Sequence, residues 1–492
     1  MNKRHLVVVG GGIAGLAAAY RAAKTSHDHD LAWKITLLEK DNYWGGKITT
    51  DRVDGFVIEG GPDTFIVTKP WAMKICRELG ISDRLYGTNP DKNATYVLKD
   101  QELAPLPEGL MMMIPSKFKP MIFTDLLSWP EKARMGLDFF IPPRKENGDE
   151  SLGGFVTRRL GRAAYERLIE PLMSGIYAGD GDQLSLTSTF PYLHELEKTH
   201  GGLIKGALAV RRRREARRVN SANSQGKGIF RTPKSGLVEI VDAYLEALRE
   251  MGVELALETA VQAVARDGDG YQLRLEGGNN LSCDAVIIAA PAYVTGALLE
   301  KLDPGLADDL QSIPYVSTAT VSLAYPQADL PVDLDGRGYV IPRREGREAL
   351  ACTWTSSKFP HRAPEGQALL RVFIGRAGQE EDLEWTEEEL LAAAKRELKA
   401  TLGIEIEPSL TRVHIWEKAM PQYNLGHPEK LEEIDRALEN YPGLEVAGNG
   451  YRGIGIPDCI HSGEQAVDRI LAALGEISAE YSEPEKEKEG IR

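Results

Sequence analysis

The feature that most constrains the fold is a glycine-rich turn near the N-terminus. The apolar stretch 5–9 reads as a short strand, the turn follows, and an alanine-rich helix is predicted over Leu16–Ala23. A GxGxxG pattern between a strand and a helix is typical of dinucleotide binding: its glycines permit a tight turn, close approach of a pyrophosphate to the helix N-terminus, and close helix–strand packing. The predicted cofactor contacts are Gly10, Gly11, Gly12, Ile13, Ala14 and Gly15.

An acidic residue ends the next predicted strand, Lys34–Glu39. Glu39 stands 24 residues after Gly15, and a polar loop predicted over 25–30 explains why this exceeds the usual gap of about 20. A carboxylate at this place accepts hydrogen bonds from a ribose diol. The pattern up to this point fits NAD as well as FAD.

Two further glycine pairs favour FAD. Gly45–Gly46 would bring a second backbone segment, with the cation Lys47, against the same pyrophosphate, which an NAD-binding domain does not need. A Gly-Gly-Pro turn follows at residues 60–62. The predicted contacts in this region are Lys40, Gly45, Gly46, Lys47, Gly61, Pro62, Asp63 and Thr64.

A late glycine-rich turn follows a strand predicted over 444–447 and precedes a helix predicted over 460–474. Its N–H groups and the helix N-terminus can face the electron-rich edge of a reduced flavin. The predicted contacts here are Gly448, Asn449, Ile454, Gly455 and Ile456.

These segments resemble the superfamily of flavin-containing amine oxidases, phytoene desaturases and protoporphyrinogen oxidases. The stretches 170–180, 351–362, 414–423 and 453–459 resemble more narrowly the soluble Gram-positive-type porphyrinogen oxidases. The resemblance implies oxidation of coproporphyrinogen III to coproporphyrin III in haem biosynthesis. It also implies that the backbone of Val261 meets the adenine, that Trp416 lies near the flavin, and that Gly175 and Ile176 lie near the porphyrinogen.

The implied chemistry needs no protein acid or base. A meso carbon flanked by pyrroles loses hydride to leave a delocalised cation, so flavin N5 is the expected acceptor, and oxygen regenerates the flavin with release of hydrogen peroxide. The protein would hold the disc and bind its propionates with cations. Candidates for this substrate binding are Lys69, Lys358, His361 and Arg362.

Three alternatives remain open. Protoporphyrinogen IX, with two propionates instead of four, is the nearest alternative substrate. An amine oxidase would need an aromatic pair facing the flavin, of which Tyr451 could supply one member. A flavin-binding protein without enzymatic activity would show no substrate-dependent oxygen consumption.

The expected fold class is α/β: a Rossmann-like FAD-binding domain with a mixed α/β substrate domain and a helical insertion. Its expected division is residues 1–69, 228–300 and 431–477 for the FAD domain, 70–210 for the helical insertion, 301–430 for the substrate domain, and 478–492 as a disordered tail. The basic run 211–218 is expected to be an exposed loop or helix end.

A net charge of −14 argues against nucleic acid as a partner. The four cysteines are scattered without metal-ligand spacing, which predicts no metal site and a reducing compartment. The chain shows neither a signal-peptide pattern nor an apolar run of about 20 residues. We therefore expect a cytoplasmic protein; its oligomeric state stays open.

The apolar insert 110–141 suggests weak association with the inner face of a membrane. The residues expected to insert are Met111–Met113, Phe118, Phe123 and Trp129, with Lys117 and Lys119 at the lipid headgroups. Lining a ligand cleft is the alternative role for this region.

Overall fold

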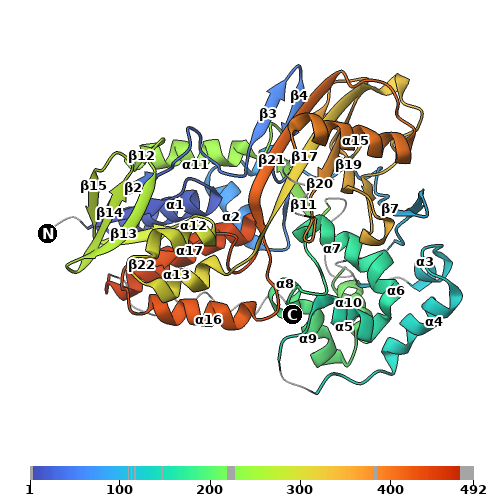
Figure 1. The fold of residues 1–492 in the computed structure, drawn as a ribbon, viewed down its shortest axis with the longest axis horizontal. Helices are drawn as coiled ribbons and strands as arrows, with labels where there is room; N and C mark the ends of the chain where they lie inside the picture. The colour runs from blue at the N-terminus through green and yellow to red at the C-terminus, as the bar shows by residue number, and fades with distance from the viewer. Residues whose placement is uncertain are drawn as a thin grey trace.

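A five-stranded parallel sheet contains the predicted nucleotide-binding strands (Figure 1). The computed structural model describes residues 4–108, 110–111, 114–115, 118–145, 148–218, 228–379 and 385–476. In spatial order the strands are β12 (Glu254–Ala256), β2 (Lys34–Leu38), β1 (His5–Val9), β16 (Ala285–Ile288) and β22 (Leu444–Val446). Segments far apart in sequence thus form one sheet, which confirms the predicted α/β class.

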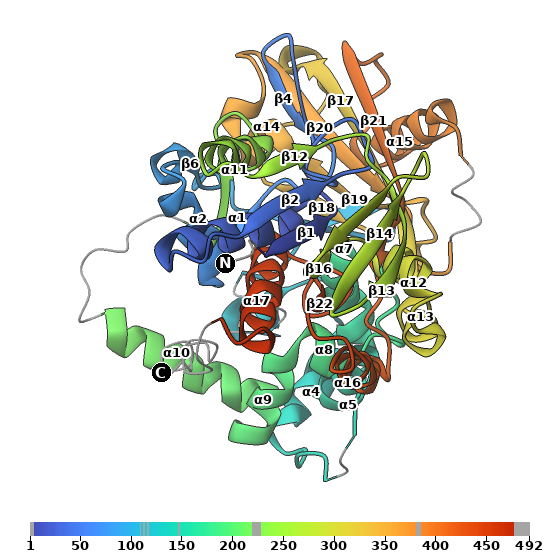
Figure 2. The ribbon, with the colours of Figure 1, turned by 90° about the vertical axis from the view of Figure 1, so that its left-hand side faces the viewer.

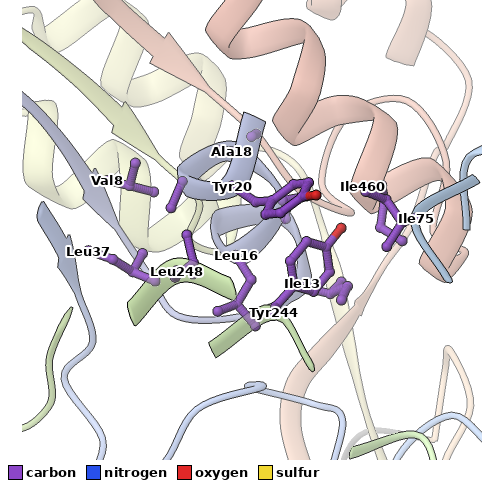
Figure 3. Close-up of a cluster of buried hydrophobic side chains, with 14 of the residues drawn as sticks. Val8, Ile13, Leu16, Ala18, Tyr20, Leu37, Ile75, Tyr244, Leu248 and Ile460 are labelled. Carbon is purple, nitrogen blue, oxygen red and sulfur yellow. The ribbon is translucent and has the colours of Figure 1, made fainter. Parts of the chain in front are cut away.

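Four helices bury their apolar sides in the core on one side of this sheet: α1 (Ile13–Asp28), α2 (Pro70–Glu78), α11 (Val238–Glu250) and α17 (Ile456–Ala473). Figure 3 shows this core, in which the rings of Tyr20 and Tyr244 meet edge to face with centroids 5.6 Å apart. A Cβ added to Gly463 would lie 2.2 Å from the carbonyl oxygen of Ala14. Helices α1 and α17 therefore pack backbone against backbone.

The other side of the sheet packs against a second core. A three-stranded antiparallel sheet and three helices form it. These are β13 (Val261–Asp267), β14 (Gly270–Leu275), β15 (Asn280–Cys283), α12 (Ala292–Leu299), α13 (Pro304–Gln311) and α16 (His427–Leu438).

A seven-stranded mixed sheet forms the second half of the molecule (Figures 1 and 2). Its order is β21 (Leu410–Pro421), β17 (Tyr315–Pro326), β20 (Gln367–Ile374), β19 (Ala349–Trp354), β18 (Gly338–Val340), β7 (Tyr96–Lys99) and β8 (Glu102–Pro105). Helix α15 (Glu387–Leu402) packs on it through Leu390 and Leu398. The short helix α14 (Thr355–Lys358) follows β19, and β3 (Thr50–Val53) and β4 (Phe56–Glu59) form a hairpin.

A cluster of helices forms a third core. Its elements are α3 (Phe118–Phe123), α4 (Trp129–Gly136), α5 (Leu152–Leu160), α6 (Arg162–Ala164), α7 (Glu170–Tyr177), α8 (Leu186–Thr189), α9 (Pro191–His200) and α10 (Leu203–Arg218), with the strand pair β9 (Leu110–Met111) and β10 (Ile114–Pro115). A separate three-stranded antiparallel sheet has the order β5 (Phe65–Ile66), β11 (Phe230–Pro233) and β6 (Leu85–Tyr86).

Several predicted boundaries were wrong. Helix α1 continues to Asp28 where a polar loop was expected, because Thr25 is buried and extends the packed side of the helix. The insertion 70–210 is not helical throughout: β7 and β8 join the seven-stranded sheet, where Val97 and Leu98 are buried. Helix α17 starts at Ile456, four residues earlier than expected, with Pro457 in its first turn.

Two further predictions concern the basic run 211–218 and the C-terminal tail. The basic run 211–218 forms the end of helix α10, which matches the helix-end alternative. The predicted tail 478–492 lies outside the described residues. Across the part of the chain that the structure describes, no helix combines the length and the apolar character needed to span a bilayer.

Candidate cofactor and substrate site

The turn after β1 has the geometry that its glycines predict. Gly10 has φ +106°, and a Cβ there would lie 2.6 Å from the carbonyl oxygen of Ala289. A Cβ on Gly15 would lie 1.8 Å from the carbonyl oxygen of Gly10. A Cβ on Gly12, the N-cap of α1, would meet nothing within 4 Å. The N-terminus of α1 is therefore open to an approaching anion.

Glu39 lies directly beside this turn. It is 8% exposed; one carboxylate oxygen accepts a hydrogen bond from the Gly11 N–H (2.7 Å) and the other from the Asp41 N–H (2.9 Å). Each oxygen can accept a further bond, as a ribose diol would require. The Thr259 N–H donates to the Glu39 carbonyl oxygen (2.8 Å), which brings the turn before Val261 to the same place.

Lys40 follows Glu39 in the chain, but its charge already has an anionic partner. Its ammonium group pairs with the carboxylate of Asp41 at 2.8 Å, and its side chain is 67% exposed. The predicted cofactor contact at Lys40 has no support from this geometry.

The second glycine pair lies against the first. The Gly45 N–H donates to the Gly11 carbonyl oxygen (2.9 Å), and a Cβ on Gly46 would lie 3.3 Å from the Gly12 Cα. Lys47 follows, and among the described residues its ammonium group has no hydrogen bond or ion pair. Burial lowers the pKa of Lys47. A partly buried cation without an anion among the described residues, next to an open helix N-terminus, fits a pyrophosphate.

The Gly60–Gly61 pair is held from the seven-stranded sheet. The Gly60 carbonyl oxygen accepts three hydrogen bonds of 2.9 Å each, from Trp416 Nε1 on β21, Arg371 Nη2 on β20 and Thr320 Oγ1 on β17. Trp416 therefore lies beside the predicted cofactor segment. Sequence analysis missed Arg371, although a single cation inside the apolar stretch of β20 was a usable signal.

Asp63 is an ionised carboxylate in this segment. Its Oδ2 lies 2.7 Å from Lys358 Nζ, and its Oδ1 accepts a hydrogen bond from Thr64 Oγ1 (3.0 Å). Burial alone would raise the pKa of Asp63, but Lys358 and Arg371 outweigh it and lower the pKa to about 2. Lys358, predicted to bind a propionate, thus already has an anionic partner.

Of the other three residues predicted to bind the substrate, Arg362 and His361 are not accessible cations. Arg362 is 1% exposed and enclosed by Glu59 (2.5 Å) and Thr232, so the expectation of a cation at the substrate rim needs correction: burial between β4 and β11 shields the guanidinium. Burial, with Arg362 and Lys234 nearby, lowers the pKa of His361 to about 4, so its ring is neutral at pH 7.

Lys69 remains next to the predicted flavin turn. Its ammonium group lies 2.5 Å from Asp458, which also accepts a hydrogen bond from the Gly455 N–H (3.3 Å) at the start of α17. The lysine is 41% exposed, so solvent and ligands can reach it.

The late glycine-rich turn is fixed by two buried rings that sequence analysis missed. Tyr423 is fully buried; its hydroxyl donates to the Asn449 carbonyl oxygen (2.5 Å) and accepts from the Gly453 N–H (2.9 Å). His427 stacks on Tyr423 with ring centroids 4.3 Å apart. Gly448 has φ +123°, and a Cβ there would meet nothing within 4 Å. The turn is thus rigidly held yet open at Gly448.

An apolar surface lies on α7. Ile176 is 46% exposed, and a Cβ on Gly175 would meet no atom within 4 Å. Ala178, directly after α7, packs with Leu350 and Ala351 in a small apolar cluster. An exposed isoleucine beside an open glycine can accept the face of a large apolar ligand.

Comparisons with known proteins agree with this geometry. A family model described as flavin containing amine oxidoreductase matches residues 13–471. Coproporphyrinogen III oxidase of Bacillus subtilis (strain 168) is 38% identical over 474 residues, which cover 96% of this chain and 99% of that protein. Coproporphyrinogen III oxidase of Propionibacterium freudenreichii subsp. freudenreichii is 37% identical over 498 residues, with 95% and 92% covered. A solved structure from Exiguobacterium sp. 255-15 is similar with a TM-score of 0.83 and 32% identity, covering 96% of this chain and all of its own.

Proposed function

Because this chain belongs to the family of flavin-containing amine oxidoreductases, we propose that it oxidises coproporphyrinogen III to coproporphyrin III with FAD as cofactor and oxygen as electron acceptor. The observation that carries the proposal is similarity over nearly the whole chain to two proteins that bear the name coproporphyrinogen III oxidase. The exposed Ile176 and the open position at Gly175 beside it support a large apolar substrate.

The residues present fit FAD. The open N-terminus of α1 and the unpaired Lys47 suit the pyrophosphate, Glu39 suits the adenosine ribose, and the turn at Gly448 with the N-terminus of α17 suits the flavin ring. When bound, FAD supplies a two-electron acceptor.

The chain's own residues would bind and orient. The N–H groups at the start of α17 favour negative charge at the flavin edge, since a helix N-terminus carries a partial positive charge. Trp416 and Arg371 hold the Gly60 carbonyl oxygen and so fix the segment that leads to Asp63. Ile176 and its neighbours would cover one face of the macrocycle and exclude water.

The test is anaerobic mixing of the purified flavoprotein with coproporphyrinogen III, protoporphyrinogen IX and simple amines in parallel. We expect coproporphyrinogen III to bleach the flavin absorbance fastest, and readmitted oxygen to restore it with formation of hydrogen peroxide. Bleaching by amines alone would contradict the proposal. An amine oxidase is disfavoured by Tyr451, which is 3% exposed and packs in an apolar core.

We propose further that an aromatic patch on the helical cluster contacts the anionic headgroups of a membrane's cytoplasmic face. The patch is Phe123, Trp129, Leu137, Phe139 and Phe140, all exposed. Lys132 Nζ lies 4.7 Å from the Trp129 ring centroid and Lys205 Nζ 4.8 Å from that of Phe139, so cations accompany the rings. The exposed Lys119 precedes the patch; Met112, Met113 and Lys117 lie outside the described residues, and the side chains of Met111 and Phe118 are not described either.

Flotation with vesicles tests this association. We expect the protein to float with vesicles containing phosphatidylglycerol, less with pure phosphatidylcholine, and not after Phe123→Ser with Trp129→Ser. The matched control is Ile406→Ser, an exposed apolar residue elsewhere. Protein that stays at the bottom of the gradient with every vesicle contradicts the association and leaves the oxidase proposal intact.

A further inference from the structure

Two half-buried arginines flank Thr88 without an acidic partner. Arg337 Nη2 donates to Thr88 Oγ1 (3.1 Å) and to Asn93 Oδ1 (2.5 Å). Arg231 Nη1 donates to the carbonyl oxygens of Gly228 (2.5 Å) and Phe230 (2.7 Å). Within the described part of the chain, no carboxylate forms an ion pair with either guanidinium.

Both groups lie near the same short segment. A Cβ on Gly87 would lie 3.3 Å from Arg231 Nη1, and the next residue, Thr88, bonds Arg337. Both guanidinium groups thus lie against the same segment, Gly87–Thr88. An anion bound at this segment would interact favourably with both guanidinium groups.

Several other partly or fully buried arginines have acidic partners. Arg158 pairs with Glu150 and Glu197, and Arg159 with Asp138. For Arg231 and Arg337 burial lowers the pKa, and no acid counteracts it. Arg337 Nε is also fully enclosed with no hydrogen-bond partner. Such an arrangement costs stability unless an anionic ligand offsets it.

The segment lies next to the predicted site. The Asn89 N–H donates to the Lys358 carbonyl oxygen (2.9 Å), and Lys358 Nζ reaches Asp63 at 2.7 Å. Lys358 Nζ also lies 6.0 Å from the ring centroid of Phe230, the neighbour of Arg231. The two arginines are therefore linked by direct contacts to the segment that follows Gly60–Gly61.

We propose that Arg231 and Arg337 together bind a propionate carboxylate of the porphyrinogen substrate. A planar guanidinium matches a carboxylate in a two-point contact, which a lysine cannot reproduce. Both side chains are half-buried, so a flexible propionate can reach them from the solvent side. The assignment rests on the proposed function, and it gives the substrate-binding role to two residues other than the enclosed Arg362 and the neutral His361.

The experiment titrates the holoenzyme with coproporphyrin III, the tetra-acid product, and with its uncharged tetramethyl ester. We expect Arg231→Met and Arg337→Met each to weaken binding of the tetra-acid about tenfold or more, the size expected for a lost charge-assisted hydrogen bond. Binding of the ester should not change. Arg436→Met, which removes an exposed cation paired with Glu432, is the matched control and should behave as wild type.

Measurements of turnover and of thermal stability distinguish a ligand-binding role of the two arginines from a purely structural one. We expect KM for coproporphyrinogen III to rise about tenfold with kcat nearly unchanged, and the melting temperature of the substrate-free variants to equal or exceed that of wild type. Arg337→Lys should restore part of the affinity and serves if a methionine variant does not fold. Variants that bind the tetra-acid like wild type, or lose tetra-acid and ester equally, overturn the inference. A wild-type protein that neither binds nor oxidises porphyrins refutes the proposed function itself.

Discussion

At the scale of single residues, Glu39 and Lys47 supply opposite charges to the predicted cofactor site. Glu39 is held by two backbone N–H groups, so its carboxylate is positioned before any ligand arrives. Lys47 is partly buried and has no anionic partner among the described residues, so a bound phosphate would supply one. Together they explain why this turn is suited to a ligand with a ribose and a pyrophosphate.

Removing the carboxylate at position 39 should weaken FAD binding. We expect Glu39→Ala to cost about 1.5–3 kcal/mol of binding free energy, because a charge-assisted hydrogen bond to the ribose is lost. Flavin retained after gel filtration, and calorimetric titration of the stripped protein, measure the effect. Lys40→Ala is the control, since Lys40 is exposed and paired with Asp41. Equal retention in both variants would remove Glu39 from the site.

The lowered pKa of Asp63 predicts that the folded protein loses part of its stability in acid. Its folded pKa, about 2, lies below the ordinary value of 3.8, so below pH 4 the unfolded chain takes up this proton more readily than the folded protein. The stabilisation, about 2 kcal/mol, is thus present above pH 4 and lost as the pH falls towards 2.

Urea unfolding at pH 6 and pH 3 measures this difference. The free energy of unfolding should fall less between these pH values for Asp63→Asn than for wild type. An equal fall in both proteins would show that Asp63 does not carry this pH dependence. Between pH 4 and 9 no step in activity should arise from Asp63, because it stays ionised throughout.

At the scale of elements, the turn between β22 and α17 depends on a residue from outside it. Tyr423 ties the start and the end of the turn through one hydroxyl, and His427 supports the tyrosine ring by stacking. The shape of the predicted flavin-binding turn is thus set by a segment about 30 residues earlier in the chain.

We expect Tyr423→Phe to loosen this turn without unfolding the protein. Two hydrogen bonds are lost, each worth roughly 0.5–1.5 kcal/mol, while the ring keeps its packing. The expected readouts are weaker FAD binding and a shift in the visible flavin spectrum or its reduction potential. Tyr441→Phe is the control, since its hydroxyl contacts Leu302 and Asp303. A variant that is less stable but has an unchanged flavin spectrum and potential would contradict a positioning role for Tyr423.

At the scale of the whole molecule, the segments predicted to bind flavin come from both halves of the fold. The glycine turns belong to the five-stranded sheet, while Trp416, Arg371 and Thr320 reach Gly60 from the seven-stranded sheet. A cofactor held between these parts adds contacts to each of them. Cofactor binding should therefore stabilise the native state as a unit.

Removing the flavin should lower the melting temperature by several degrees. The cause is the loss of binding free energy together with the uncompensated charge of Lys47, whose pKa is lowered by burial. Differential scanning fluorimetry of stripped and reconstituted protein checks this, with added FAD expected to raise the melting temperature in a concentration-dependent manner. Lys47→Met should shrink the gain on adding FAD without lowering the melting temperature of the stripped protein; an undiminished gain would contradict the assigned role.

The sequence by itself determined the local features. The strand, the glycine turn and the helix as far as residue 23 follow from the steric needs of glycine and from short-range periodicity, and Glu39 lies beside Gly11 as its spacing predicts. Each motif of the resemblance is an unbroken stretch of sequence, so the motifs were sufficient to predict the family.

Only the tertiary structure decided which charged side chains have an ion-pair partner and which have none among the described residues. Lysine and arginine look alike in a sequence, but Arg362 is enclosed by Glu59, Lys358 is paired with Asp63, and Arg231 and Arg337 have no acidic partner among the described residues. Likewise β7 and β8 joined the seven-stranded sheet although their surroundings looked helical. The physical reason is that an ion pair or a strand pairing depends on partners far away in the chain, and local sequence does not specify which distant groups become neighbours.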